Sequence, residues 1–250
     1  MELKGQVALV TGAGRGIGRA IAFGLARAGA TVAVNDIDPA TAQTTVEALT
    51  AAGHTAAAFP ADVADPEAVI GLIAAIMALW ARLDVLVNNA GVEPTGPIVD
   101  FALADWQRAL AVNLTAPFLT CQAAGRVMKA QGGGAIVNIS SIAGRTAGLR
   151  NRAAYVATKT GLLGFTRECA REFAAYNIRV NAVCPGVIIT EMTAHLRDNE
   201  PMMRKWLEDI PQGRLGEPDD VVGLVVFLCT DAARYLTGQA INVDGGKVMS

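Results

Sequence analysis

The sequence is poor in the residues that most often build metal centres and disulfide frameworks. It has four cysteines in 250 residues, and they are too far apart for the spacing of a metal site. All four lie in apolar segments, where cysteine serves as a small hydrophobic residue. We therefore expect no metal ion and a reducing, cytoplasmic environment. The four are Cys121, Cys169, Cys184 and Cys229.

Charge and long apolar runs are also scarce. Charged residues make up 18% of the chain, the net charge is -2, and the 21 lysines and arginines are scattered rather than gathered in a stripe. A nucleic-acid partner is therefore not expected. The segment 1–5 lacks the pattern of a signal peptide, and no apolar segment approaches the roughly 20 residues of a membrane helix. We expect no membrane partner either.

Small apolar residues are what the sequence has instead. Apolar residues make up 52% of the chain, and glycine occupies 26 positions. This composition suits close packing of helices on a sheet. The length of 250 residues, without an evident linker, predicts a single domain over 1–250.

Short apolar segments alternate with helical patterns along the whole chain. The short segments are apolar throughout, as is typical of strands with both faces covered. The alternation predicts an α/β doubly wound fold with a seven-stranded, mostly parallel sheet and right-handed crossovers. The expected strands are 7–10, 31–34, 55–59, 85–87, 135–139, 179–183 and 240–243, and the expected helices are 19–28, 40–52, 68–79, 104–131, 155–176 and 218–230.

The segment 192–214 interrupts this alternation. It is long, charged and broken by Pro201 and Pro211. Long excursions in compact domains are often lids over binding sites, so we expect a substrate lid at about 192–214. His195 lies in this segment and is a candidate substrate contact, although a lone histidine in such a place is more often a surface residue.

The segment 11–18, TGAGRGIG, joins the first expected strand to a helix. Backbone without side chains can approach a pyrophosphate group there, next to the positive end of the helix dipole. The strand–turn–helix position favours a dinucleotide site, although glycine-rich turns also serve ordinary strand-to-helix connections. The glycines are Gly12, Gly14, Gly16 and Gly18.

Asp36 follows the second expected strand. A carboxylate at that place accepts hydrogen bonds from the adenosine ribose hydroxyls and repels a 2′-phosphate, which favours NAD over NADP. The segment 35–38 also fits a helix cap, and the cation Arg15 beside the glycine turn would suit a 2′-phosphate. The carboxylate carries more weight because it would face the added phosphate charge directly.

Tyr155 and Lys159 lie one helical turn apart and project from the same helix face. A tyrosine with a pKa of about 10 is a poor base at neutral pH, and a neighbouring ammonium group lowers that pKa. The pair fits general acid–base catalysis, although tyrosine and lysine also meet this spacing by chance on many helices.

Polar side chains also gather where other expected strands end. Ser140 and Ser141 end one strand, and the segment 88–91, NNAG, ends another. Asn113 lies within an expected helix, where its amide is otherwise unhelpful. Since the carboxyl ends of parallel strands meet at one sheet edge, these groups are expected to converge on a substrate oxygen.

Together these motifs resemble the short-chain dehydrogenase/reductase family. TGAGRGIG, NNAG, Asn113, NISS, YVATK and CPG, with TGQAINVDGG near the end, follow the family's order and approximate spacing over essentially the whole chain. The resemblance implies a single-domain Rossmann fold. It also implies hydride transfer between a nicotinamide ring and a secondary alcohol or its ketone.

The resemblance assigns roles to four residues. Tyr155 would be the acid–base residue, and Ser141 would hold and polarise the substrate oxygen. Lys159 would lower the pKa of Tyr155 and bind the nicotinamide ribose, while Asn113 would hold a water that links this lysine to a proton relay. These four form the expected catalytic group.

One spacing departs from the family pattern. Family members often have one step fewer between the serine and the tyrosine, whereas Ser141 to Tyr155 is fourteen steps. A one-residue insertion within 145–154 would account for the difference. Ser140 is the alternative to Ser141, although the pattern SIAG aligns on Ser141.

The resemblance also implies a set of residues that line the cofactor. Asp62 and Val63 would meet the adenine edge, although they also fit a helix cap before Pro66. Thr190 would bond the nicotinamide carboxamide, or it is a plain loop hydroxyl. The set is Gly12, Arg15, Gly16, Ile17, Gly18, Asp36, Asp62, Val63, Asn89, Tyr155, Lys159, Pro185, Ile188 and Thr190.

Two substrate classes follow from the resemblance. One is the 3-oxoacyl chain on acyl carrier protein, reduced with NADPH; in such reductases two basic residues commonly hold the carrier, and Gly132 and Tyr176 take their places here. The other, which Asp36 favours, is a small polyol, sugar or related alcohol used with NAD. Glu93 and the segment 150–152 would supply polar contacts to it, or they are solvated loop residues.

A non-catalytic dinucleotide-binding sensor is a third possibility. It predicts damage to the serine, tyrosine and lysine set, and none is visible. The resemblance further implies a homotetramer, in which the helices at 104–131 and 155–176 commonly pair across subunits. We expect a small-molecule substrate and a homo-oligomer.

Overall fold

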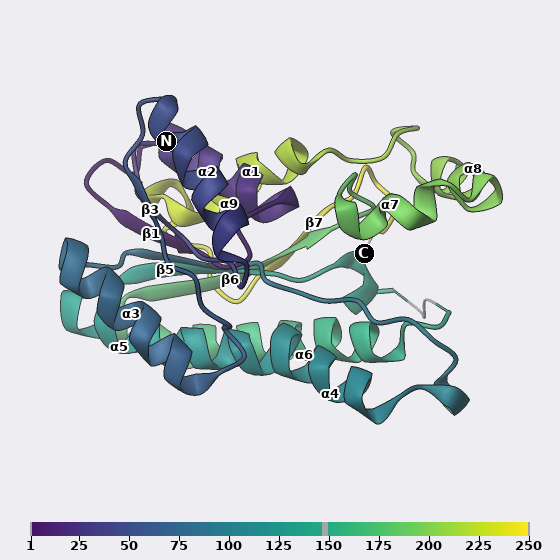
Figure 1. Cartoon of the computed structure of the whole chain (residues 1–250), viewed down its shortest axis with the longest axis horizontal. Coiled ribbons are helices and arrows are strands. Elements are labelled where there is room, and N and C mark those ends of the chain that lie inside the picture. The colour runs from purple at the N-terminus through teal and green to yellow at the C-terminus, as the bar shows by residue number, and fades with distance from the viewer. Residues whose placement is uncertain (1, 147–149, 250) are drawn as a thin grey trace.

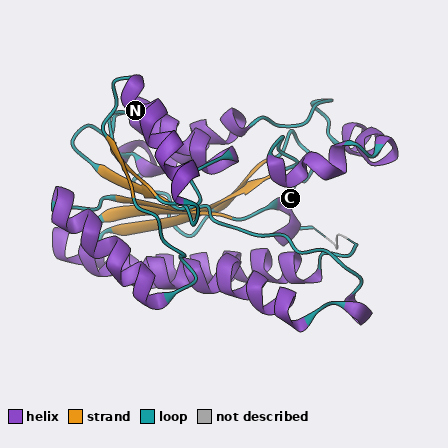
Figure 2. Cartoon of the chain, viewed as in Figure 1, coloured by secondary structure: helices purple, strands orange, loops and turns teal. Residues whose placement is uncertain are grey.

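The computed structural model describes residues 2–146 and 150–249, apart from the side chains of 195–197, and shows one seven-stranded sheet (Figures 1 and 2). Its described strand pairs are parallel, in the order β3-β2-β1-β4-β5-β6-β7. The winding direction reverses between β1 and β4, so the predicted doubly wound fold is confirmed. The strands are β1 Val7–Val10, β2 Thr31–Val34, β3 Ala56–Ala58, β4 Val85–Asn88, β5 Gly134–Ile139, β6 Ile178–Pro185 and β7 Ala240–Val243.

Helices cover both faces of this sheet. In Figure 1, α1, α2 and α9 lie on the upper face, and α3, α4, α5 and α6 lie on the lower one. Their bounds are α1 Gly16–Arg27, α2 Pro39–Ala51, α3 Pro66–Trp80, α4 Leu103–Leu110, α5 Ala116–Gln131, α6 Ala153–Phe173, α7 Glu191–Arg197, α8 Glu200–Asp209 and α9 Pro218–Cys229. The all-apolar strands are thus explained, since water reaches neither face of the central ones.

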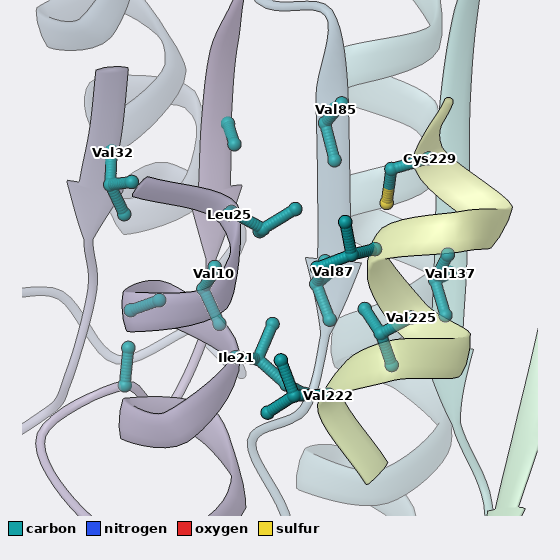
Figure 3. Packing of buried hydrophobic residues seen from close by; sticks show 14 of the residues in the cluster. Val10, Ile21, Leu25, Val32, Val85, Val87, Val137, Val222, Val225 and Cys229 are labelled. Carbon is teal, nitrogen blue, oxygen red and sulfur yellow. The ribbon is translucent and has the colours of Figure 1, made fainter. Parts of the chain in front are cut away.

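The core on the upper face is built from branched aliphatic side chains of α1, α9 and the central strands. Figure 3 shows Ile21 of α1 beside Val222 of α9. A Cβ atom on Gly24 would overlap the Val222 side chain, so glycine lets the two helices approach closely. This packing fixes α1, and with it the glycine turn before α1, against the sheet.

Two expected segments differ from the structure. The helix expected at 104–131 is α4, a π-helical turn at Ala111–Thr115, and α5. The excursion 192–214 contains α7 and α8. Asn199 caps α8 by accepting a hydrogen bond from the Met202 N–H at 3.1 Å, and Pro201 lies in the first helical turn, where its missing N–H leaves no hydrogen bond unmade.

Over residues 2–146 and 150–249, none of the helices combines the length and the apolar character that a membrane span needs.

Candidate active site

A cleft of about 610 Å³ runs along the carboxyl ends of the strands. Its size is that of a small-ligand pocket, and it lies where the winding direction of the sheet reverses, the usual ligand position in doubly wound folds. Of the predicted catalytic and cofactor-lining residues, Asn113 and Gly18 do not line it. Those that do are Gly12, Arg15, Gly16, Ile17, Asp36, Asp62, Val63, Asn89, Ser141, Tyr155, Lys159, Pro185, Ile188 and Thr190.

The glycine turn is held by the segment NNAG. Gly12 has φ +60°, and a Cβ atom there would lie 2.9 Å from the Ala90 Cα. The Asn89 side-chain amide donates to the carbonyls of Thr11 at 2.9 Å and Gly12 at 3.0 Å. Gly18 is buried, and its Cβ would overlap the Gly12 carbonyl, so it acts by letting α1 pack closely rather than by facing the cleft.

Asp36 and Asp38 divide the two roles proposed for the end of β2. The Asp36 carboxylate accepts hydrogen bonds from the Gly14 N–H at 2.9 Å and the Asp38 N–H at 3.1 Å. Asp38 caps α2 by accepting from the Ala40 N–H at 2.9 Å. Asp36 is therefore half-buried in the cleft wall against the glycine turn, while Arg15 is exposed at the start of α1.

Asp62 is not the cap of α3. That cap is Asp65, which accepts from the Glu67 N–H at 3.0 Å. Asp62 instead accepts from the Ala64 N–H at 2.9 Å and pairs with the Arg108 guanidinium at 3.4 Å. Its carboxylate therefore belongs to the cleft wall that follows β3.

Tyr155 and Lys159 of α6 face the end of β5, where Ser141 lies. Tyr155 and Ser141 share a side-chain hydrogen bond, and Ser141 Oγ also accepts from the Ala143 N–H at 3.1 Å. The Lys159 ammonium donates to the Ile139 carbonyl at 2.9 Å. The structure thus brings the predicted serine, tyrosine and lysine together in one wall.

Ser140 and Ser141 point to different partners. Ser140 Oγ donates to the Lys159 carbonyl at 2.9 Å, which ties β5 to α6, whereas the hydroxyl of Ser141 meets that of Tyr155. This geometry supports Ser141 as the residue that faces a substrate oxygen. The insertion expected within 145–154 includes 147–149, which lie outside the described residues.

Burial shifts both titratable groups toward their uncharged forms. It raises the pKa of Tyr155 to about 12, with the Glu93 carboxylate adding to the rise and Ser141 and Arg152 opposing it. It lowers the pKa of Lys159 to about 8. The shift of Tyr155 is opposite to the one predicted from the sequence, because burial and the Glu93 carboxylate outweigh Ser141 and Arg152, which lower the pKa. The Lys159 ammonium lies 5.7 Å from the tyrosine ring centroid.

Asn113 lies in the π-helical turn and braces the segment after NNAG. Its Oδ1 accepts from the Val92 N–H at 2.8 Å, and its Nδ2 donates to the Val92 carbonyl at 2.9 Å and to Thr158 Oγ1 at 3.1 Å. Its amide therefore links the β4 end to α6 directly behind Tyr155. The predicted water site stays a prediction.

The far end of the cleft contains charged residues that the sequence left ambiguous. Glu93 and Arg152 form an ion pair at 3.0 Å, with side chains only 8% and 17% exposed, so they are not solvated loop residues. Arg150 is exposed and does not line the cleft. The side chain of His195 lies outside the described residues.

The cleft residues that sequence reasoning missed include Met192, Trp206 and Lys247. Met192 and Trp206 belong to α7 and α8. Lys247 follows the last strand and belongs to none of the motifs. For Met192 and Trp206, the only feature of the sequence that pointed to the cleft was their position within the expected lid. For Lys247 no feature of the sequence did so.

Comparisons with known proteins decide the family. Residues 12–247 match the family model described as enoyl-(acyl carrier protein) reductase. A 3-oxoacyl-[acyl-carrier-protein] reductase of Synechocystis sp. is 45% identical over 249 residues, which is 99% of this chain and 98% of the relative. The chain belongs to the short-chain dehydrogenase/reductase family.

Other members of the family differ in substrate. An L-rhamnose 1-dehydrogenase (NAD(P)(+)) of Azotobacter vinelandii is 41% identical over 251 residues, 98% of each chain. The crystal structure of a gluconate 5-dehydrogenase from Burkholderia cenocepacia, in complex with NADP and tartrate, superposes with a TM-score of 0.95 at 36% identity and covers 98% of this chain and 96% of that one. The protein is thus a short-chain dehydrogenase/reductase that acts on alcohol or ketone groups with a nicotinamide dinucleotide.

Proposed function

We propose that the protein oxidises a secondary alcohol of a small, polar, hydroxylated molecule with NAD, or reduces the matching ketone. The proposal rests on one observation, which is that charged side chains lie at both ends of the same cleft. Asp36 lies at the end that would hold the adenosine ribose, and the Glu93–Arg152 pair lies beyond Tyr155. An acyl chain packed against that ion pair would displace water from Glu93 and Arg152. The chain has no polar groups that could replace the hydrogen bonds of that water.

The residues around Tyr155 fit the chemistry of alcohol and ketone interconversion. When bound, the dinucleotide would supply or accept the hydride. The Ser141 hydroxyl would hold the substrate oxygen, and the Tyr155 hydroxyl would deliver a proton to it during reduction or remove one during oxidation. Because the pKa of Tyr155 is raised to about 12, its phenol is protonated at neutral pH, which suits reduction. Alcohol oxidation should therefore accelerate as the pH rises.

The cofactor residues fit a dinucleotide stretched along the cleft. The glycine turn before α1 would approach the pyrophosphate, Asp62 and Val63 would border the adenine, and Lys159 would bind the nicotinamide ribose. Thr190 and Ile188 would border the nicotinamide. We propose NAD rather than NADP on the strength of Asp36, although the named relatives include NAD(P)- and NADP-binding proteins.

Initial rates test the proposal. NAD and NADP are each supplied with polyols, sugars, cyclic alcohols and 3-hydroxyacyl esters, and NADH and NADPH with the matching ketones. NAD-linked turnover of a polar alcohol supports the proposal. Preference for NADPH with 3-oxoacyl substrates contradicts it.

Reduction of 3-oxoacyl groups on acyl carrier protein is the second candidate. The name of the Synechocystis relative favours it, and so does Lys129, whose ammonium lies 4.1 Å from the ring centroid of Tyr176. That lysine places a cation beside a position where carrier-binding relatives have a basic residue. Titration with an acyl carrier protein, followed by light scattering, separates the two candidates.

We further propose that the protein is a cytoplasmic homotetramer. All four cysteines are free and buried, as a reducing compartment would allow, and α5 and α6 carry the small residues that close helix pairing needs. Light scattering that returns the monomer mass of 25.9 kDa contradicts the tetramer.

A further inference from the structure

Two of the cations in the cleft wall are neutralised within the cleft itself. Arg108 pairs with Asp62 at 3.4 Å, and Arg152 pairs with Glu93 at 3.0 Å. In both pairs the cation and its carboxylate line the cleft. A bound molecule therefore meets these four residues as two neutral pairs, rich in hydrogen-bonding atoms but without a surplus of charge.

Lys247 differs from these arginines in where its counter-ion lies. Its ammonium group pairs with Asp209 at 3.2 Å, but Asp209 does not line the cleft, whereas Lys247 does. The side chain of Lys247 is 17% exposed and that of Asp209 is 45% exposed. A molecule bound in the cleft therefore meets Lys247 without meeting its counter-ion.

Hydrogen bonds and packing hold Lys247 on the same side of the cleft as Ser141. The Val248 N–H donates to Asp244 Oδ2 at 2.8 Å, and the Asn242 amide donates to the Val248 carbonyl at 2.8 Å. The Val248 side chain packs on the small apolar cluster that contains Ile142, the residue after Ser141. Lys247 is therefore carried on a fixed segment whose next residue packs on the cluster that contains Ile142.

We propose that the substrate is a hydroxylated carboxylic acid whose carboxylate binds Lys247, with the Glu93–Arg152 pair taking its hydroxyl groups. This rests on the proposed function. An ammonium group carries three N–H donors, so Lys247 can bind a substrate carboxylate while it keeps Asp209 or releases it to water. Asp209 is the last residue of α8, so the same lysine connects the proposed carboxylate site to the helix whose Trp206 lines the cleft.

The test compares a six-carbon aldonate with the alditol of the same length and configuration, using the cofactor that supports the faster turnover. We expect a higher kcat/KM for the aldonate. In Lys247→Met the KM for the aldonate should rise about 10- to 100-fold, as for loss of a charge-assisted hydrogen bond, while the kinetics of the alditol and the kcat of both stay unchanged. Lys129→Met, which removes a surface lysine stacked on Tyr176, is the matched control.

Asp209→Asn separates binding from a purely structural role. If Lys247 binds the carboxylate, removing its counter-ion leaves the KM for the aldonate unchanged or lower. If Lys247 and Asp209 only fasten α8, both variants should alter the aldonate and the alditol alike, and that result overturns the proposal. Lys247→Gln is the second variant in case the methionine variant unfolds at a lower temperature than the wild type.

A binding measurement keeps this inference separate from the proposed function. If no alcohol is turned over, the proposed function fails, and the aldonate is titrated into the protein with NADH while nucleotide fluorescence is recorded. Binding that Lys247→Met weakens supports the carboxylate site without turnover. Equal binding to both proteins, or none to the wild type, overturns it, as does turnover of alditol and aldonate with equal kcat/KM.

Discussion

The two ends of the cleft hold their polar groups in different surroundings. At the Asp36 end, the half-buried carboxylate lies in the cleft wall and accepts hydrogen bonds from two backbone N–H groups. At the Tyr155 end, burial shifts the pKa of the phenol upward and that of the Lys159 ammonium downward, so it favours neutral forms. The comparison separates a recognition end, where a carboxylate is fixed by backbone hydrogen bonds, from a reacting end, where protons can be exchanged.

The largest expected effect comes from removing the reacting hydroxyl. In Tyr155→Phe, kcat should fall by about 10²- to 10⁴-fold, because general acid–base catalysis contributes about that factor. Binding of the dinucleotide, measured by fluorescence titration, should stay within about twofold, a change too small to alter the free energy of binding appreciably. A variant that keeps its turnover would show that the two ends are not divided in this way.

Removing the charge at the recognition end should change the choice of cofactor. In Asp36→Asn, the ratio of kcat/KM for NAD to that for NADP should fall by about 10- to 100-fold, since one set of charge-assisted hydrogen bonds and one repulsion are lost. Asp38→Asn is the matched control, because Asp38 caps α2 and does not line the cleft. An unchanged ratio in Asp36→Asn assigns cofactor choice to other residues.

Lys159 should give the free protein a pH-dependent stability. Its pKa is about 8 in the folded protein and about 10.5 when unfolded, so the unfolded chain binds more protons between these values. The contribution of Lys159 to the free energy of unfolding should therefore rise with pH across this window, by about 1 to 3 kcal/mol in total. The buried cysteines Cys121, Cys184 and Cys229, whose pKa values are raised, act with the opposite sign in both proteins. Urea unfolding without nucleotide, from pH 7 to 9.5, should therefore show the effect of Lys159 as a difference between the pH slopes of the wild type and Lys159→Met.

Above pH 10, the unfolding measurement no longer isolates the contribution of Lys159. There Tyr155 acts with the opposite sign, because its pKa is raised in the folded protein and the unfolded chain loses its proton first. A slope that is equal in Lys159→Met and in the wild type below pH 9.5 would contradict the assignment to Lys159.

The smallest expected effect is on the acidity of Tyr155. Glu93 raises its pKa and Arg152 lowers it, so Glu93→Gln should move the alkaline limb of the kcat profile for alcohol oxidation to lower pH, and Arg152→Gln should move it to higher pH. The opposite signs distinguish electrostatics from general damage, which would move both profiles alike. Thermal unfolding of both variants checks that the protein remains folded.

Sequence reasoning recovered the sheet because its signal is local. Strands β1, β2 and β7 have the predicted bounds, since a run of apolar residues between helices needs no tertiary information to be recognised. It missed α8 because Pro201 was interpreted as a breaker, whereas in the first turn of α8 a proline is tolerated. The position of Pro201 relative to the start of α8 therefore explains why this helix was missed.

Sequence reasoning found the site residues that belong to recognisable motifs. It did not find the properties that depend on how the chain packs. The glycine turn, Asp36, Ser141, Tyr155 and Lys159 come together in the cleft as expected. The direction of the Tyr155 pKa shift was wrong, because the degree of burial depends on the whole fold and not on the spacing of two residues. Lys247 was invisible for the same reason.

The π-helical turn at Ala111–Thr115 makes the length of this helical stretch as important as its composition. A π turn holds one residue more than an α turn, so it absorbs an added residue without breaking the helical stretch. Deleting a single residue there would let α4 and α5 join in a continuous α-helix, and the wide turn that brings Asn113 to Val92 would be lost. A change of length in 111–115 would therefore disturb the segment after NNAG as much as a substitution of Asn113 itself.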